Sequence, residues 1–230
     1  MSAPGLSGRP ALLFDLDGTL VDSVYQHVLA WRDALEGEGF HLSVWRIHRR
    51  IGMSGGLFLR ALVRELGHNL TDEQAEVLRQ SHASAFLKRM DQVRPLTGAR
   101  ELLSDLTSMK VPWAIATSGS RQTAAGALAL LGIPEGTPVI TRDQVAYAKP
   151  NPDLFLVAAE RLGMATRDCF VVGDSIWDLL AAQRAGALGV GVLSGGYGRE
   201  ELERAGAYRV YDDPADLHAH LDELGIRPAG

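Results

Sequence analysis

Short apolar runs alternate with helical patterns along most of the chain. The runs have the length of buried strands, and most of them end at a glycine or a polar residue. We expect strands at 11–14, 113–116, 138–140, 169–172, 188–193 and 208–211. We expect helices between them at 99–109, 121–131, 152–162, 176–185 and 213–224. This alternation predicts an α/β fold with a doubly wound, Rossmann-like parallel sheet that helices cover on both faces.

One long interval breaks the alternation. Residues 23–92 contain no convincing strand, and glycines separate four helical patterns within them. These expected helices lie at 24–36, 43–50, 57–66 and 72–90. We therefore predict an all-helical cap domain at 23–92, inserted after the first strand of an α/β core domain that comprises 1–22 and 93–230.

Length, charge and cysteine content narrow the class of protein. The 230 residues suit one main domain with a modest insertion, and the formal net charge is −5. An acidic chain without a basic stripe is a poor nucleic-acid binder, and no apolar run reaches the length of a bilayer span. The N-terminal residues 1–10 contain no apolar signal segment, and the single cysteine, Cys169, reads as a buried core residue. We expect a cytoplasmic protein, monomeric or homodimeric, without nucleic-acid or membrane partners.

Polar side chains follow the apolar runs where a parallel sheet binds its ligands. Four carboxylates, two hydroxyls and one amine occur there: Asp15, Asp17, Asp174, Asp178, Thr117, Ser118 and Lys149. Four carboxylates in one crevice repel each other unless a hard cation neutralises them, and Mg²⁺ binds both carboxylate and phosphate oxygens. The amine and the hydroxyls can bind the remaining phosphate oxygens. The set therefore predicts a Mg²⁺ site that accepts a phosphoryl group.

Some of these residues also fit ordinary structural roles. Asp178 ends a Ser-x-x-Asp capping box, so it could serve the following helix alone. Lys149 could be a solvated surface lysine, and Thr117 could be a β-branched strand end. Ser23 begins a second capping box, Ser-x-x-Gln, which predicts a structural role for it.

The segment DLDGTLVDS at 15–23 resembles the signature motif of the haloacid dehalogenase-like hydrolase superfamily. Thr117, Lys149 and the Gly-Asp-x-x-x-Asp motif at 173–178 resemble its other motifs, in the same order and spacing. The resemblance covers essentially the whole chain, including a helical cap as in the phosphoglycolate phosphatase and β-phosphoglucomutase branch. It implies a Mg²⁺-dependent phosphatase that hydrolyses a small phosphorylated metabolite, phosphoglycolate or a sugar phosphate, through an aspartyl-phosphate.

The resemblance also implies a role for each motif residue. Asp15 is the expected nucleophile, and Asp17 is the expected general acid–base for the leaving alkoxide and the attacking water. Lys149 is expected to pair with the nucleophile. The expected phosphate-binding residues are Thr117, Ser118 and Lys149, and the expected Mg²⁺ site comprises Asp15, Asp17, Asp174 and Asp178. Members of the superfamily that cleave carbon–halogen or phosphonate bonds lack the second aspartate, so Asp17 favours phosphate esters.

The cap is expected to select the substrate. His27 and Trp31 share one helix face, an arrangement that resembles sugar-phosphate phosphatases, although a packed helix with a satisfied histidine explains it equally well. Arg49 and Arg50 could clamp a carboxylate or a second phosphate. The remaining cap histidines are scattered and indicate no metal site: His41, His48, His68 and His82.

Two other functions remain open at this stage. A β-phosphoglucomutase-type sugar-phosphate mutase shares the motifs, but the mutases carry an arginine in the segment where this chain has Ser-Gly-Gly at 54–56. A catalytically silent phosphate-binding protein would be expected to lack the nucleophile or the acid–base carboxylate, and this chain retains both.

Overall fold

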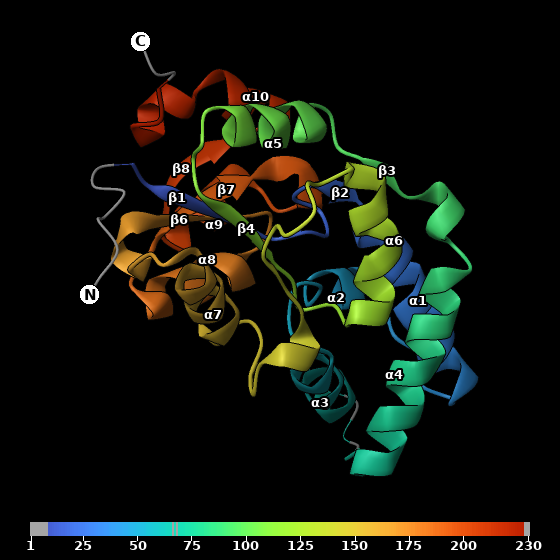
Figure 1. Ribbon diagram of the computed structural model, residues 1–230. Coiled ribbons are helices and arrows are strands. Elements are labelled where there is room, and N and C mark those ends of the chain that lie inside the picture. Colours follow the sequence, from blue (N-terminus) through green and yellow to red (C-terminus); the bar gives the residue numbers. More distant parts are fainter. Residues whose placement is uncertain (1–8, 66, 68, 228–230) are drawn as a thin grey trace.

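The computed structural model of the protein describes residues 9–65, 67 and 69–227 (Figure 1). Most of the predicted N-terminal tail, His68 and the last residue of the helix predicted at 57–66 lie outside this part of the chain. Among the described residues, no helix combines the length and the apolar character needed to cross a membrane.

A six-stranded parallel sheet forms the centre of the molecule, with the strand order β5-β4-β1-β6-β7-β8. Its strands are β1 (Ala11–Phe14), β4 (Trp113–Ala116), β5 (Val139–Ile140), β6 (Cys169–Gly173), β7 (Leu188–Val192) and β8 (Ala207–Tyr211). Every residue of β1 is fully buried, because this strand lies between β4 and β6 and helices cover both of its faces. Each predicted strand is therefore present, within one or two residues of its expected bounds.

Two helical layers cover the sheet (Figure 1). Leu12 and Phe14 point to the face covered by α5 (Ala99–Ser108), α6 (Arg121–Leu131) and α10 (Pro214–Ala219). Ala11 and Leu13 point to the opposite face, against α7 (Asp153–Leu162) and α8 (Ile176–Ala185). This period of two along β1 gives each face its own apolar core. The predicted doubly wound fold is confirmed.

The structure differs from the predicted elements near the C-terminus. The single helix predicted at 213–224 is wrong: α10 ends at Ala219, His220 leaves the helical conformation with φ −122° and ψ 27°, and a 3₁₀ turn follows at Leu221–Leu224. A short helix that the sequence pattern did not predict, α9 (Arg199–Arg204), precedes β8.

Four helices form the cap: α1 (Val24–Gly37), α2 (Val44–His48), α3 (Gly55–Glu65) and α4 (Asp72–Leu87). They share a separate apolar cluster that includes Val28, Trp31, Phe58 and Leu78. An antiparallel ribbon of β2 (Val21–Asp22) and β3 (Arg94–Pro95), which was not predicted, joins the two chain crossings between sheet and cap. The predicted all-helical cap after the first strand is therefore present.

Candidate active site

Three buried carboxylates meet beyond the ends of β1 and β6. Asp15 follows β1, Asp174 follows β6, and Asp178 lies in the first turn of α8. One oxygen atom of each lies within 4.8 Å of the others, and none of the three residues is more than 4% exposed. The strands are parallel neighbours that pair Phe14 with Val172, so the residues after them emerge side by side. These three side chains are a candidate metal site.

Lys149 is fully buried beside these carboxylates, which excludes the surface position considered above. Its Nζ contacts Asp15 Oδ1 and lies 2.8 Å from Asp178 Oδ1. Burial lowers the pKa of Lys149, but the two facing carboxylates outweigh this effect, and the net pKa is raised. One lysine beside three carboxylates leaves two negative charges in a buried site.

The unbalanced charge is visible in the carboxyl groups themselves. Burial raises the pKa of Asp15 to about 7, although Lys149 opposes the shift. Burial and the neighbouring Asp178 and Asp15 raise the pKa of Asp174 well above its ordinary value. A buried carboxylate resists ionisation unless a cation faces it, and a divalent cation would supply the two missing positive charges. The oxygen donors present suit Mg²⁺.

Asp178 has two contacts at once. Its Oδ2 accepts hydrogen bonds from the Ser175 backbone N–H at 3.2 Å and from the Ser175 hydroxyl at 2.5 Å, which forms the predicted capping box of α8. Its Oδ1 faces Lys149. The capping interpretation is therefore correct but incomplete, because the two oxygens have different partners.

Two glycines enclose Asp174. A Cβ atom on Gly195 would lie 1.6 Å from Asp174 Oδ2, and a Cβ atom on Gly18 would lie 2.7 Å from the same oxygen. Gly18 also has a φ of +84°, which residues other than glycine rarely adopt. The Thr19 hydroxyl donates to Asp174 Oδ1 at 3.3 Å. Glycine backbone thus packs against Asp174 Oδ2, and the Thr19 hydroxyl binds Oδ1.

Asp17 faces the cap instead of the lysine. Its Oδ1 accepts from the Ser23 hydroxyl at 2.6 Å and lies 3.2 Å from His27 Nε2. Burial opposes ionisation of Asp17, but the facing His27 and the hydrogen bonds from His27 and Ser23 outweigh it and lower the pKa. The capping role predicted for Ser23 is wrong, because its side chain makes no cap hydrogen bond to α1 and is bonded to Asp17.

His27 belongs to a stack of rings that continues into α4. Its Nδ1 lies 3.0 Å from His82 Nε2, and its ring lies 3.7 Å from that of Phe86. The His82 ring in turn stacks on Trp31 at 4.0 Å. Burial and the neighbouring His27 lower the pKa of His82 well below its ordinary value, so His82 is neutral. No local pattern connects His82 with His27, because 55 positions separate them.

A cavity of about 150 Å³ lies between these groups and the cap. Of the predicted site residues, the structure brings these to its wall: Asp15, Asp17, Thr117, Ser118, His27, Trp31 and Arg50. Thr117 Oγ1 accepts from the Gly119 N–H at 2.9 Å, and the Ser118 hydroxyl donates to the cap residue Gly52 at 3.0 Å. Two further arginines, Arg79 and Arg142, and several apolar side chains complete the wall.

Arg49 does not line this cavity in the described part of the chain. Its guanidinium pairs with Glu201 on α9 and lies 4.2 Å from the centre of the Tyr197 ring. Its carbonyl oxygen accepts from the Tyr197 hydroxyl at 2.7 Å and from Trp177 Nε1 at 3.3 Å. Arg49 thus joins cap and core beside the cavity, whereas its neighbour Arg50 faces the cavity.

Comparison with known proteins agrees with this geometry. The family model described as haloacid dehalogenase-like hydrolase matches residues 10–186. The crystal structure of a hydrolase from Pseudomonas syringae superimposes with a TM-score of 0.92 at 54% identity, over 94% of this chain and 99% of that one. Hexitol phosphatase A of Escherichia coli is 35% identical over 76% of this chain and 78% of its own. Phosphoglycolate phosphatase of Rhodospirillum rubrum is 30% identical over 95% of this chain and 96% of its own. The chain therefore belongs to the haloacid dehalogenase-like hydrolase family, among its phosphatases.

Proposed function

We propose that the protein is a Mg²⁺-dependent phosphatase that hydrolyses a sugar phosphate or phosphoglycolate through an aspartyl-phosphate on Asp15. The family assignment supports the coarser statement, a phosphatase of small phosphorylated metabolites. One observation supports the more detailed proposal of a Mg²⁺ site and an aspartyl-phosphate. Asp15 is held by Lys149, shares a buried oxygen cluster with Asp174 and Asp178, and opens onto a cavity that it shares with Asp17.

The core residues divide the first chemical step between them. Asp15 attacks phosphorus as an ionised carboxylate, and Lys149 stabilises that charge and orients the attacking group. The hydroxyls of Thr117 and Ser118 are placed to bind phosphoryl oxygens from the same cavity wall. Asp15, Asp174 and Asp178, with Asp17 beside them, would hold Mg²⁺, which would supply positive charge to the cluster and to the phosphoryl oxygens.

Asp17 carries the proton in both steps. It gives a proton to the alkoxide as the ester bond breaks, and it removes one from the water that hydrolyses the aspartyl-phosphate. Its lowered pKa suits the second step, in which an ionised carboxylate is needed. Its hydrogen bonds to Ser23 and His27 fix the orientation of the carboxylate towards the cavity.

The substrate assignment rests on the cavity and on the relatives. A cavity of about 150 Å³ suits a small ester, and its wall mixes hydrogen-bonding groups with apolar side chains. The names of the relatives state hexitol phosphate and phosphoglycolate as their substrate classes. We also propose that 1–22 and 93–230 form the core domain and 23–92 the cap domain. The ribbon of β2 and β3 supports this division, because both chain crossings lie within it.

A phosphate-release assay across a panel of esters tests this proposal. The panel contains hexitol and hexose phosphates, phosphoglycolate, glycerol phosphate and nucleotides, each with Mg²⁺ or with a chelator. We expect Mg²⁺-dependent hydrolysis of sugar phosphates or phosphoglycolate, and none by Asp15→Asn. Hydrolysis of nucleotides alone, or unchanged turnover by Asp15→Asn, would refute it. Isomer formation without phosphate release would identify the mutase instead.

A further inference from the structure

The wall of the active-site cavity opposite the carboxylates is positively charged. Arg50, Arg79 and Arg142 all line it, whereas Asp15 and Asp17 are the acidic residues among the described lining. Arg50 follows α2, Arg79 lies on α4, and Arg142 lies in the turn after β5. Three separate parts of the chain thus place guanidinium groups on one small cavity.

Two of these arginines have carboxylate partners. Arg50 pairs with Glu65 on α3. Arg79 pairs with Glu76 one turn earlier on α4, with its Nη2 2.5 Å from Glu76 Oε2. Both pairs are open to water on one side, so the carboxylates reduce the positive charge of the wall without removing its hydrogen-bond donors.

Arg142 has no such partner in the part of the chain that the structure describes. Its side chain donates from Nη1 to the Val145 carbonyl oxygen at 2.7 Å, and no carboxylate of the described residues forms an ion pair with it. The adjacent Asp143 is turned away, because its Oδ2 accepts from the Arg121 N–H at 2.6 Å. A half-buried guanidinium that lines a cavity and has no ion-pair partner among the described residues is a site for an anionic ligand.

The backbone fixes Arg142 relative to the reaction centre. The Arg142 N–H donates to the Gly119 carbonyl oxygen at 2.9 Å, which ties its turn to the loop that carries Thr117 and Ser118. The backbone of Arg142 is therefore tied to the same loop as the proposed phosphate-binding hydroxyls. This position suits Arg142 for binding a group of the substrate.

Arg79 crosses the start of α3, where the chain has two glycines. A Cβ atom on Gly55 would lie 3.7 Å from Arg79 Cδ, and one on Gly56 would lie 3.9 Å from Arg79 Nη1. A long side chain at either position would compete with Arg79 for this space. The glycines therefore leave the cavity wall to an arginine that comes from α4.

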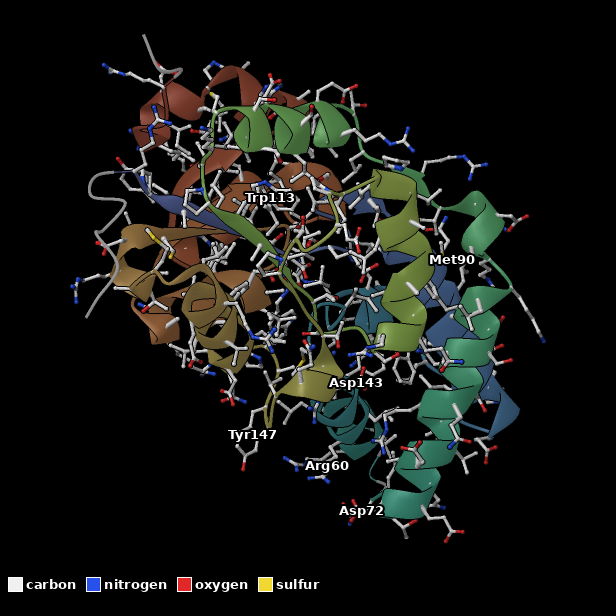
Figure 2. All side chains as sticks on the ribbon, in the orientation of Figure 1. Arg60, Asp72, Met90, Trp113, Asp143 and Tyr147 are labelled. Carbon is white, nitrogen blue, oxygen red and sulfur yellow. The ribbon has the colours of Figure 1, made fainter. Side chains whose placement is uncertain are left out.

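Arg142 also borders a second cavity of about 460 Å³ between α3 and the loop before α7. Tyr147 and Arg60 line it, and Figure 2 shows both beside α3, with Asp143 between α3 and the start of α6. No aspartate or glutamate is among its described lining residues. Arg142 thus lines both cavities, and the two arginines of the second one, Arg60 and Arg142, favour anions there.

From these observations we infer that the preferred substrate carries a second anionic group, a carboxylate or a second phosphate, which Arg142 and Arg79 bind. This inference rests on the proposed function, because it concerns the end of the ester remote from Asp15. A neutral polyol phosphate would leave the Arg142 guanidinium without a charged partner.

Two matched pairs of esters test the inference. 6-Phosphogluconate and glucitol 6-phosphate differ only in a carboxylate against a hydroxymethyl group, and fructose 1,6-bisphosphate and fructose 1-phosphate differ in the second phosphate. We expect kcat/KM to favour the anionic member of at least one pair by about tenfold or more, since charge-assisted hydrogen bonds have that strength. The pair that shows the preference distinguishes carboxylate from phosphate.

Variants assign the preference to residues. Arg142→Gln and Arg79→Gln should lower the ratio of kcat/KM between the anionic and the neutral ester by about tenfold, whereas the control Arg204→Gln, on an exposed ion pair, should not change it. A wild-type ratio near one in both pairs, or variants that lower both members equally, overturns the inference and leaves the proposed function intact.

A binding measurement keeps the two proposals separable if no ester in these pairs is hydrolysed. Calorimetry on Asp15→Asn compares the dissociation constants of the paired esters without turnover. Binding of the anionic member about tenfold more tightly, lost when Arg142→Gln is added, supports the inference whether or not these esters are hydrolysed. Equal affinities overturn it.

Discussion

The floor and the wall of the active-site cavity use charge in opposite ways. On the floor, Asp15, Asp174, Asp178 and Lys149 are almost completely buried, and Lys149 pairs with two of the three carboxylates. On the cap side of the wall, arginine ion pairs stay open to water, as in the pair of Arg79 with Glu76. Buried charges without partners cost several kcal/mol, whereas exposed ion pairs contribute roughly 0–1 kcal/mol.

This difference in burial indicates where the molecule tolerates substitutions. A substitution on the floor disturbs a group of charges that compensate one another, so it affects chemistry, metal binding and stability together. A substitution of a wall arginine alters one guanidinium and its local contacts and leaves the fold in place. The floor therefore fixes the reaction, and the wall is the part that can be adapted to the substrate.

The two regions are nevertheless joined by backbone contacts. The Ser54 N–H at the start of α3 donates to the Lys149 carbonyl oxygen at 3.0 Å. His48 Nε2 lies 2.9 Å from the carbonyl oxygen of Gly195, the residue that packs against Asp174. Cap residues thus contact the same loops that hold the floor. Single substitutions can separate the roles of floor and wall.

The largest effect is expected for Asp15→Asn on the floor. We predict a loss of kcat of about 10⁴-fold or more, because the amide cannot form the covalent intermediate. Phosphate release measures it, and a thermal melt shows whether the variant is folded. Asp22→Asn is the matched control, since Asp22 belongs to the same motif but is exposed. Comparable losses in both variants would contradict a specific role for Asp15.

The next largest effect is expected for Gly195→Ala. The new Cβ would lie 1.6 Å from Asp174 Oδ2, so either the loop or the carboxylate must move. We predict that the affinity for Mg²⁺ falls by about 100-fold, as for other changes that displace a metal ligand. Magnesium titration of activity measures it. Gly37→Ala is the control, because nothing lies within 4 Å of its Cβ position, and it should bind Mg²⁺ normally.

A cap substitution next to the floor should have a smaller effect. His27→Ala removes the imidazole that faces Asp17, so we predict that kcat falls by about tenfold while Mg²⁺ affinity is unchanged. His41→Ala, an exposed cap histidine, serves as control. An equal loss of Mg²⁺ affinity would show that His27 acts on the floor as a whole and not through Asp17.

The smallest effect is expected in the stability of the metal-free protein. The pKa of Asp15, about 7 in the folded state, exceeds its ordinary value of 3.8, so between these values the folded protein binds more protons than the unfolded chain. Stability should therefore fall as pH rises, and Asp174 acts in the same direction. We predict that the melting temperature with a chelator drops by roughly 2–4 °C between about pH 6.5 and 8.

This pH window avoids an opposing contribution. The lowered pKa of His82 makes the folded protein less stable below its ordinary pKa of 6.5, because the unfolded chain then binds the extra proton. Magnesium should stabilise the protein more at about pH 8 than at pH 6.5, since ionised carboxylates bind it best. Melting curves with chelator and with Mg²⁺ test this, and Asp15→Asn should flatten the dependence. A metal-free protein that gains stability towards pH 8 would disprove the prediction.

Much of the fold could be predicted because its signals are local. Each strand of the sheet is a short apolar run, and the cap helices are separated by glycines, so local pattern was enough to place both. The floor residues could be listed for a related reason. Asp15, Thr117 and Asp174 follow parallel strands, and the carboxyl ends of such strands lie at one edge of the sheet. The structure brings Asp15 and Asp174 together at that edge.

Where local signals were ambiguous, the sequence pattern failed. Ser23 fits a capping box, but a hydrogen bond to Asp17 takes its hydroxyl instead. Residues 213–224 have helical character throughout, but the helix breaks at His220. At Ser23 a tertiary contact overrides a local capping preference of about 1 kcal/mol, and at His220 the conformation changes without a signal in the sequence pattern.

The sequence by itself determined the α/β sheet, the inserted helical cap and the set of carboxylates that follow the strands. Only the tertiary structure decided which cap residues face them: His82 behind His27, Arg79 over the glycines of α3, and Arg142 on the cavity wall while Arg49 turns away. The difference lies in the sequence distance between the residues that come into contact. Strand ends converge by the rules of sheet geometry, whereas contacts between cap and core depend on how two separately packed units meet, and no periodicity in the chain encodes that.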